Sequence, residues 1–115
     1  MLLGWSMVIR AKSVVFKKDG EYTIFSKVYD VEKVEEPSHI DLVTKALKRG
    51  FSDNDFLALS TSTWNPFTIE IYPQLDGKTK KKLSKLIKLD IQLILQKRAN
   101  KILSKKVDGK ERWII

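Results

Sequence analysis

Alternating apolar and polar positions predict two strands at the start of the chain. Val, Ile, Phe and Tyr are frequent between residues 8 and 34, and the run is broken once, at Lys17-Lys18-Asp19-Gly20. An Asp-Gly pair between two β-rich segments is a strong signal for a hairpin, because glycine tolerates the positive φ of a tight turn. We therefore predict strands at about 8–17 and 21–33.

The second predicted strand is apolar on both faces. Apolar side chains alternate on one face at Tyr22, Ile24 and Val28, and on the other at Phe25, Tyr29 and Val31. Ser26 lies near the change from one set to the other. Such a pattern is typical of a strand that carries a bulge or that runs between a core and a partner surface.

A short helix is predicted at about 39–49. Ser38, with Asp41 three residues later, resembles a capping box, and Gly50 suits the left-handed position just after a helix. Ile40, Val43 and Leu47 recur at helical spacing between these two signals. We interpret this helix as structural, and His39 in its first turn as a surface residue.

A second pair of strands is predicted at 56–62 and 67–72, and Pro73 ends it. Residues Phe67, Ile69 and Ile71 alternate with polar neighbours, which indicates a strand with one buried face. Trp64 lies with Phe67 at the tip of this hairpin. Exposed aromatic side chains can stack on single-stranded bases, but we favour the interpretation that both rings close the edge of the core beneath the following helix.

The longest helical pattern covers about 79–105 and is amphipathic. At 100° per residue, the apolar side chains of its first half fall on one arc, namely Leu83, Leu86, Ile87, Ile91, Leu93 and Ile94. Lysines and glutamines fall opposite, which predicts a core-facing helix with a basic outer face. Asp90 lies inside the apolar arc and is either a buried acid, an ion-pair partner of Lys97, Lys12 or Lys27, or a residue at the boundary with water.

Beyond about residue 96 this helix is expected to leave the core. Lys97, Arg98 and Lys101 point along the arc that the apolar residues occupy, and burying three unpaired cations would be prohibitive. At 1.5 Å per residue the helix spans about 40 Å, whereas a compact chain of this length is about 34 Å across. The exposed end is compatible with a duplex groove, or with a homodimer in which Leu95, Ala99, Ile102 and Leu103 form a second apolar strip.

The order of elements predicts an α+β fold. Two β-hairpins and two helices, ββα-ββα with a possible short strand at 112–115, form an antiparallel sheet with helices on one face and a long basic C-terminal helix. The 115 residues suit one domain, 1–115, with residues 1–6 a frayed lead. No export signal and no apolar stretch of membrane-spanning length occurs, so a cytoplasmic protein is expected.

Charge is distributed unevenly along the chain. The net charge is +8, yet residues 77–115 alone hold thirteen basic and three acidic side chains, a net +10. A cationic element on a nearly neutral body is typical of a protein that binds a polyanion. Lysine-rich helices also occur simply as solvated faces, in thermophiles or in organisms of low genomic GC content.

Composition excludes several classes of site. The chain has no cysteine and one histidine, which rules out thiolate or multi-histidine metal centres and a cysteine nucleophile. The five glycines are isolated, so no phosphate-binding loop or dinucleotide-binding motif exists. No cofactor is indicated. Asp53, Asp55 and Glu70 are a weak candidate set for Mg²⁺, but Asp-Asn-Asp is also a common turn sequence.

Three functional hypotheses follow. The first is a small nucleic-acid-binding protein, expected to be a homodimer, that contacts phosphates with little or no sequence specificity. Its contact residues would be the cations of the long helix: Lys78, Lys80, Lys81, Lys82, Lys85, Lys88, Lys97, Arg98, Lys101, Lys105 and Lys106. The second is an accessory or inhibitory protein of viral or plasmid type whose basic helix docks on an acidic partner. The third, a metal-dependent nuclease, is the one enzymatic alternative.

Overall fold

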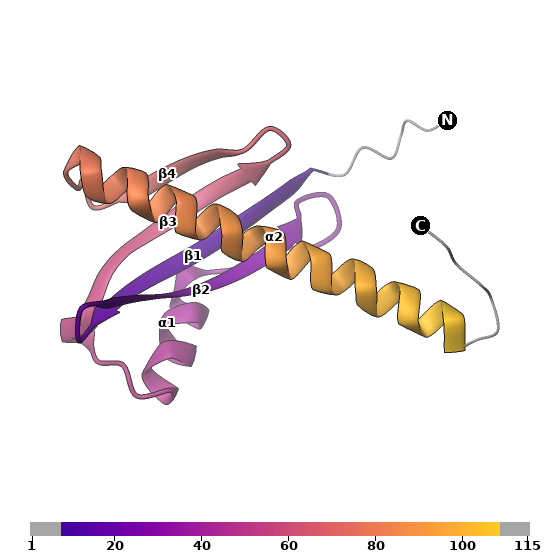
Figure 1. The fold of residues 1–115 in the computed structure, drawn as a ribbon, viewed down its shortest axis with the longest axis horizontal. Helices are drawn as coiled ribbons and strands as arrows, with labels where there is room; N and C mark the ends of the chain where they lie inside the picture. Colours follow the sequence, from indigo (N-terminus) through magenta and orange to yellow (C-terminus); the bar gives the residue numbers. More distant parts are fainter. Residues whose placement is uncertain (1–7, 109–115) are drawn as a thin grey trace.

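A four-stranded antiparallel sheet with one helix on each face forms the molecule (Figure 1). The computed structural model describes the backbone of residues 8–108 and the side chains of residues 8–98. The elements in chain order are β1 (Ile9–Lys18), β2 (Glu21–Asp30), α1 (His39–Lys48), the short 3-10 helix η2 (Asp53–Asp55), β3 (Phe56–Trp64), β4 (Thr68–Tyr72) and α2 (Gly77–Asp108). The predicted α+β order is confirmed. The expected lead at 1–6 and the expected strand at 112–115 lie outside the described residues.

The strand order is β2-β1-β3-β4, so β2 and β4 form the two edges. Asp19 and Gly20 both have positive φ, 52° and 82°, as the predicted tight turn between β1 and β2 requires. β2 itself pairs with β1 without a register shift over its whole length. The irregularity lies instead in the β1–β3 pairing, between Val15 and Phe16.

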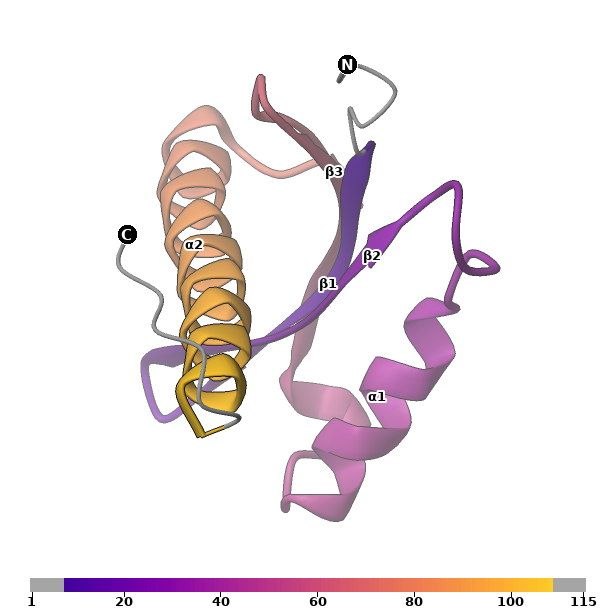
Figure 2. The ribbon, with the colours of Figure 1, turned by 90° about the vertical axis from the view of Figure 1, so that its right-hand side faces the viewer.

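The two helices cover opposite faces of the sheet, which corrects the expectation that both lie on one face (Figure 2). Val15 and Val28 pack against α2, whereas Val14, Phe16 and Phe25 pack against α1. Successive residues of a strand point to opposite faces, so β1 and β2 each supply two cores. This arrangement explains why β2 is apolar on both sides.

Small side chains line the face of the sheet beneath α2. This stripe consists of Ala11, Ser13, Ala58, Ser60 and Ser62, all of which are buried. The β1–β3 register pairs Ala11 with Ser62, Ser13 with Ser60, and Ala58 with Val15. Leu83, Ile87 and Ile91 of α2 are fully buried against the same cluster. Short side chains on the sheet leave room for the larger aliphatic side chains of the helix.

The limits of α1 follow from local hydrogen bonds that its sequence predicts. The Ser38 hydroxyl accepts from the backbone N–H of Ile40 at 3.1 Å. At the other end Gly50 has φ 99°, and the N–H groups of Gly50 and Phe51 donate to the carbonyls of Leu47 and Ala46. This is the Schellman arrangement that a glycine just after a helix permits.

Helix α2 makes the molecule elongated. The molecule has principal extents of 49 × 29 × 26 Å and a radius of gyration of 16.3 Å. Figure 1 shows the last turns of α2 projecting past the sheet. This agrees with the expectation that the helix leaves the core beyond about residue 96. The predicted long C-terminal helix is confirmed, and it begins two residues earlier and ends three later than expected.

Candidate nucleic-acid interface

Five lysines form an outward face on the first three turns of α2. We call Lys78, Lys81, Lys82, Lys85 and Lys88 the lysine face; all five are exposed. At 100° per residue they lie opposite the buried Leu83 and Ile87. Lys78 and Lys88 are about 15 Å apart along the helix axis. No acidic residue occurs between Gly77 and Leu89, so nothing within the helix neutralises this face.

Position within the helix adds to this positive potential. The N-terminal end of a helix carries a partial positive charge from its free N–H groups, and the first turn of α2 has no acidic residue. Asp76, just before the helix, accepts from the backbone N–H of Thr79 at 3.2 Å. Hydrogen bonding by Thr79 lowers the pKa of the Asp76 carboxyl, so this single anion caps a helix end that is otherwise cationic.

A lysine from the first hairpin joins the lysine face through Tyr22. The ammonium groups of Lys17 and Lys82 lie 5.2 and 5.1 Å from the centre of the Tyr22 ring. Lys17 is opposite Tyr22 in the hairpin register, and α2 brings Lys82 to the same ring. Lys17 was not among the residues expected from the sequence; only the hairpin register, which places Lys17 across from Tyr22, could have indicated it.

The remaining basic candidates have different surroundings. Lys80 faces away from the lysine face and lines a shallow hollow of about 300 Å³ with Glu70 and Tyr72. Lys97 and Arg98 are exposed, and the Arg98 guanidinium donates to the carbonyl oxygen of Val28 at 2.8 Å. Arg98 therefore binds the edge of β2. Lys101, Lys105 and Lys106 lie outside the residues whose side chains are described.

Leu93 departs from the predicted arc, and Leu95 departs from the predicted dimer strip. Leu93 was expected to face the core, but 53 % of it is exposed, and Leu89 is 56 % exposed. Leu95 was expected to serve a twofold mate, yet it is half-buried against the core of its own chain. Ala99, Ile102 and Leu103, the rest of that expected strip, lie outside the described side chains.

The aromatic pair at the second hairpin belongs to the core. Trp64 and Phe67 pack edge to face, with ring centres 5.9 Å apart, against the cluster beneath α2. The Lys88 ammonium lies 5.7 Å from the Phe67 ring centre. The interpretation that these rings close the core edge is confirmed, which leaves base stacking there without support.

The three carboxylates considered for Mg²⁺ are not brought together. Asp55 accepts from both the backbone N–H and the hydroxyl of Ser52, at 2.9 and 3.2 Å, as a turn residue does. Glu70 pairs with Thr61, five residues along β3 from Phe56, which is about 16 Å from the turn. Within residues 8–98, no three acidic or histidine side chains form a group that could hold a metal ion.

His39 and Asp90 also have defined positions. The imidazole Nε2 of His39 donates to the carbonyl oxygen of Ser60 at 2.7 Å, so this half-buried ring ties α1 to β3 and is not the free surface residue that was expected. Asp90 is half-buried beside β2 and makes no ion pair within the described side chains. Lys12, one of its expected partners, instead donates to Glu36 at 2.6 Å.

No protein-family model, curated protein or solved structure matches this chain. Among the described helices, none combines the length and the apolar character needed to cross a membrane.

Proposed function

We propose that this protein binds nucleic acid by neutralising phosphates with the lysine face of α2. The observation that carries the proposal is the uninterrupted row of five exposed lysines at the positive end of a helix, without an acidic residue between them. Duplex DNA carries one charge per 1.7 Å of axis, so 15 Å of duplex presents about nine phosphate charges. Flexible ammonium groups match such a row of charges without requiring a fixed register.

The expected binding is independent of base sequence. Lysine ammonium groups on phosphates position a protein on nucleic acid but do not read base edges. The described lysines belong to an exposed helix face and to a hairpin end. The aromatic rings beside them are Tyr22, half-buried beneath the Lys17 and Lys82 ammonium groups, and Phe67, which packs with Trp64 at the core edge. Affinity should therefore depend strongly on salt and weakly on sequence.

The test compares two triple variants in a salt titration. Lys78→Gln, Lys81→Gln and Lys85→Gln together remove three charges from the lysine face; Lys27→Gln, Lys33→Gln and Lys48→Gln remove three exposed charges elsewhere. Fluorescence anisotropy with a labelled 20-base-pair duplex would give affinity against salt concentration. We expect the first variant to lose about tenfold in affinity and to lower the slope of log K against log salt by about 2 to 3.

The control variant should leave both affinity and slope within about twofold of the unmodified protein, because its lysines are dispersed over other surfaces. Equal losses in the two variants would mean that binding follows net charge alone. Absence of binding at low salt would contradict the proposal outright.

A further inference from the structure

Strand β2 presents a long free edge. The N–H of Val31 donates to the carbonyl of Val8, and hydrogen-bonded pairs alternate along an antiparallel ladder. With the β1–β2 register, the backbone groups of Ile24 and Ser26 therefore point away from β1. Further along the same edge, the carbonyl oxygen of Val28 accepts a hydrogen bond from the Arg98 guanidinium. The other edge strand, β4, has only five residues and ends before Pro73, which limits pairing there.

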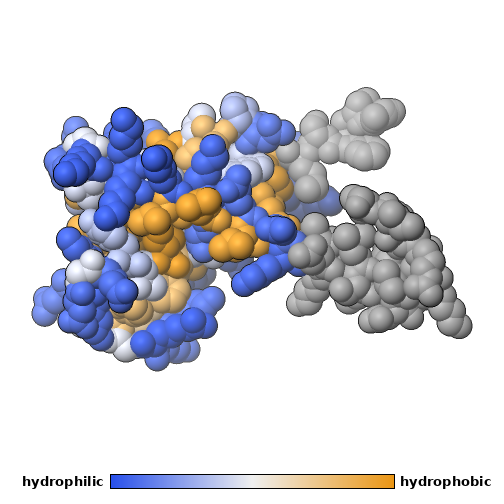
Figure 3. All heavy atoms as spheres, in the orientation of Figure 1, coloured by the Kyte–Doolittle hydropathy of each residue, from blue (hydrophilic) through white to orange (hydrophobic). Residues whose placement is uncertain are grey.

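Helix α2 begins beside β4, crosses the sheet and reaches the β2 edge with its second half (Figure 1). Lys82 lies over Tyr22 and Arg98 reaches Val28, so the helix and β2 run in the same direction. The midpoint of that helix segment is residue 90, and the midpoint of the strand segment is residue 25. In agreement with this, the α2 side chains that line the cleft beside residues 23–26 of β2 are Asp90, Ile94 and Lys97. Figure 3 shows an apolar area near the middle of this face, between hydrophilic side chains.

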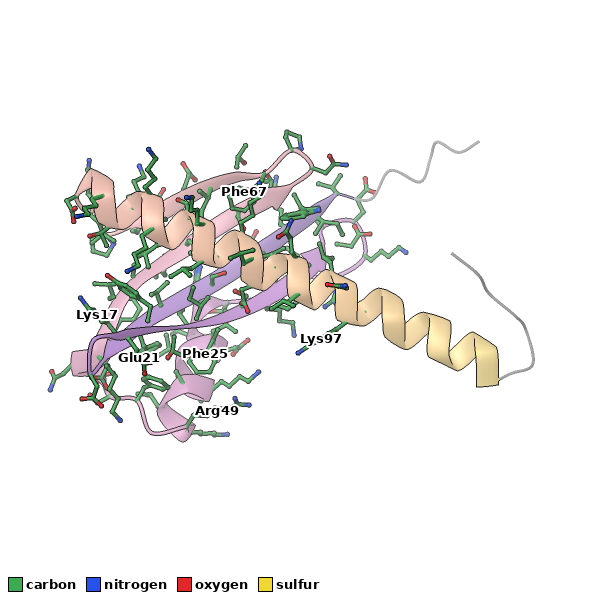
Figure 4. All side chains as sticks on the ribbon, in the orientation of Figure 1. Lys17, Glu21, Phe25, Arg49, Phe67 and Lys97 are labelled. Atoms are coloured by element: carbon green, nitrogen blue, oxygen red, sulfur yellow. The ribbon has the colours of Figure 1, made fainter. Side chains whose placement is uncertain are left out.

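The cleft beside this edge, between α1 and α2, is cationic. This cleft of about 570 Å³ beside residues 23–26 of β2 is lined by Lys45 and Arg49 of α1 and by Asp90 and Lys97 of α2. The Arg49 guanidinium lies 5.9 Å from the Phe25 ring centre, and Figure 4 shows these two side chains together beside β2, with Lys97 further along α2. Three cations against one carboxylate leave this cleft with a net positive charge.

We propose that β2 accepts an extended peptide segment of a partner protein as a fifth strand, and that the segment alternates apolar and acidic residues. Backbone hydrogen bonds to Ile24 and Ser26 would supply affinity, as in other cases of strand addition. Because side chains of a strand alternate between faces, apolar residues of the segment would meet Ile94 of α2 while acidic residues meet Lys45 and Arg49 of α1. This surface is distinct from the lysine face.

Charge favours such a segment over a second copy of this chain. Antiparallel pairing of two β2 edges about a twofold axis keeps both α1 helices on one side of the joined sheet. Lys45 and Arg49 of one copy would then approach the same cations of the other, and like charges in contact are unfavourable. An acidic segment replaces this repulsion by attraction.

The first experiment uses a labelled peptide of sequence Thr-Val-Glu-Val-Glu-Val-Asp-Thr and a matched peptide in which lysine replaces each acidic residue. Anisotropy titrations should give at least about tenfold tighter binding for the acidic peptide. Ser26→Pro removes the outward N–H, which an edge strand tolerates, and should weaken the acidic peptide by about tenfold or more. Ser26→Ala keeps the N–H and should bind within about twofold of the unmodified protein.

A second variant keeps the proposal testable if the proline prevents folding. Lys45→Glu with Arg49→Glu reverses the cleft charge at exposed positions and should reverse the peptide preference. Equal binding of the two peptides, or no saturable binding of the acidic one, would overturn the proposal. So would sedimentation showing a dimer that Ser26→Pro dissociates, because the edge would then belong to a second copy. DNA affinity of Ser26→Pro should be unchanged, which separates this test from that of the lysine face.

Discussion

Two buried serines under α2 have opposite hydrogen-bonding situations. The Ser13 hydroxyl lies 2.7 Å from the Ser26 hydroxyl, whereas the Ser62 hydroxyl has no partner among the described residues. Both side chains are buried, at 0 and 1 % exposure. A buried hydroxyl without a partner opposes folding, while a hydrogen-bonded one contributes a net stabilisation.

Removing these two hydroxyls should therefore have different effects. We expect Ser13→Ala to lower the free energy of unfolding by about 1 kcal/mol, because Ser26 also loses its partner, and Ser62→Ala to leave it unchanged or to raise it by up to about 1 kcal/mol. Urea unfolding at neutral pH measures both. A loss in Ser62→Ala equal to that in Ser13→Ala would show that the Ser62 hydroxyl is satisfied in the folded protein.

Sequence patterns could not predict that these serines are buried. A hydroxyl residue in a strand counts as polar in any periodicity, so Ser60 and Ser62 had no feature that distinguished them from exposed positions. Their burial depends on the β1–β3 register, which pairs Ser13 with Ser60 and Ala11 with Ser62. For Lys17, the hairpin register indicates only its position across from Tyr22; that Lys82 reaches the same ring depends on the packing of α2 over the first hairpin.

At the level of elements, local signals predicted more than long-range ones. The Asp19-Gly20 turn, the Ser38 cap and Gly50 defined their elements because each acts within a few residues. The side of the sheet that each helix covers was wrongly predicted, although the two-sided pattern of β2 contained the information: Val28 and Phe25 face different helices. Amphipathicity indicates that a helix is buried on one side, but not against which face of the sheet.

The start of α2 provides a prediction that depends on pH. Hydrogen bonding by Thr79 lowers the pKa of Asp76 below its usual value. A carboxyl whose pKa is lower in the folded state stabilises that state above its unfolded pKa, and the contribution is lost as pH falls through the folded pKa. Asp76→Ala should therefore lower the urea midpoint at neutral pH, and the difference from the unmodified protein should shrink below about pH 4.

Asp76→Asn serves as the control for that experiment. An asparagine still accepts the hydrogen bond from the N–H of Thr79 and has a similar N-cap preference, but it lacks the negative charge that the positive helix end stabilises. Its urea midpoint at neutral pH should lie between those of the unmodified protein and Asp76→Ala. If Asp76→Ala retains its deficit unchanged in acid, the ionised form of Asp76 does not cap the helix.

At the scale of the whole molecule, the charge of α2 opposes its own stability. Lysines near the positive end of a helix, close to one another and without acidic neighbours, repel each other and the helix dipole. Elsewhere the local signals agree with the fold, as in the capped α1 and the tight first hairpin. A feature that conflicts with folding in an otherwise consistent chain is expected at functional surfaces.

This conflict predicts that the lysine face lowers the free energy of unfolding while it favours the binding of nucleic acid. In low salt, the variant with Lys78→Gln, Lys81→Gln and Lys85→Gln should unfold at higher urea than the unmodified protein, with a gain of about 1 kcal/mol. The gain should disappear as salt rises to about 1 M, where the Debye length is about 3 Å and the repulsion is screened. The Lys27, Lys33 and Lys48 variant removes the same charge from dispersed sites and should gain less. Equal stabilisation of both variants would assign the effect to net charge and not to the lysine face.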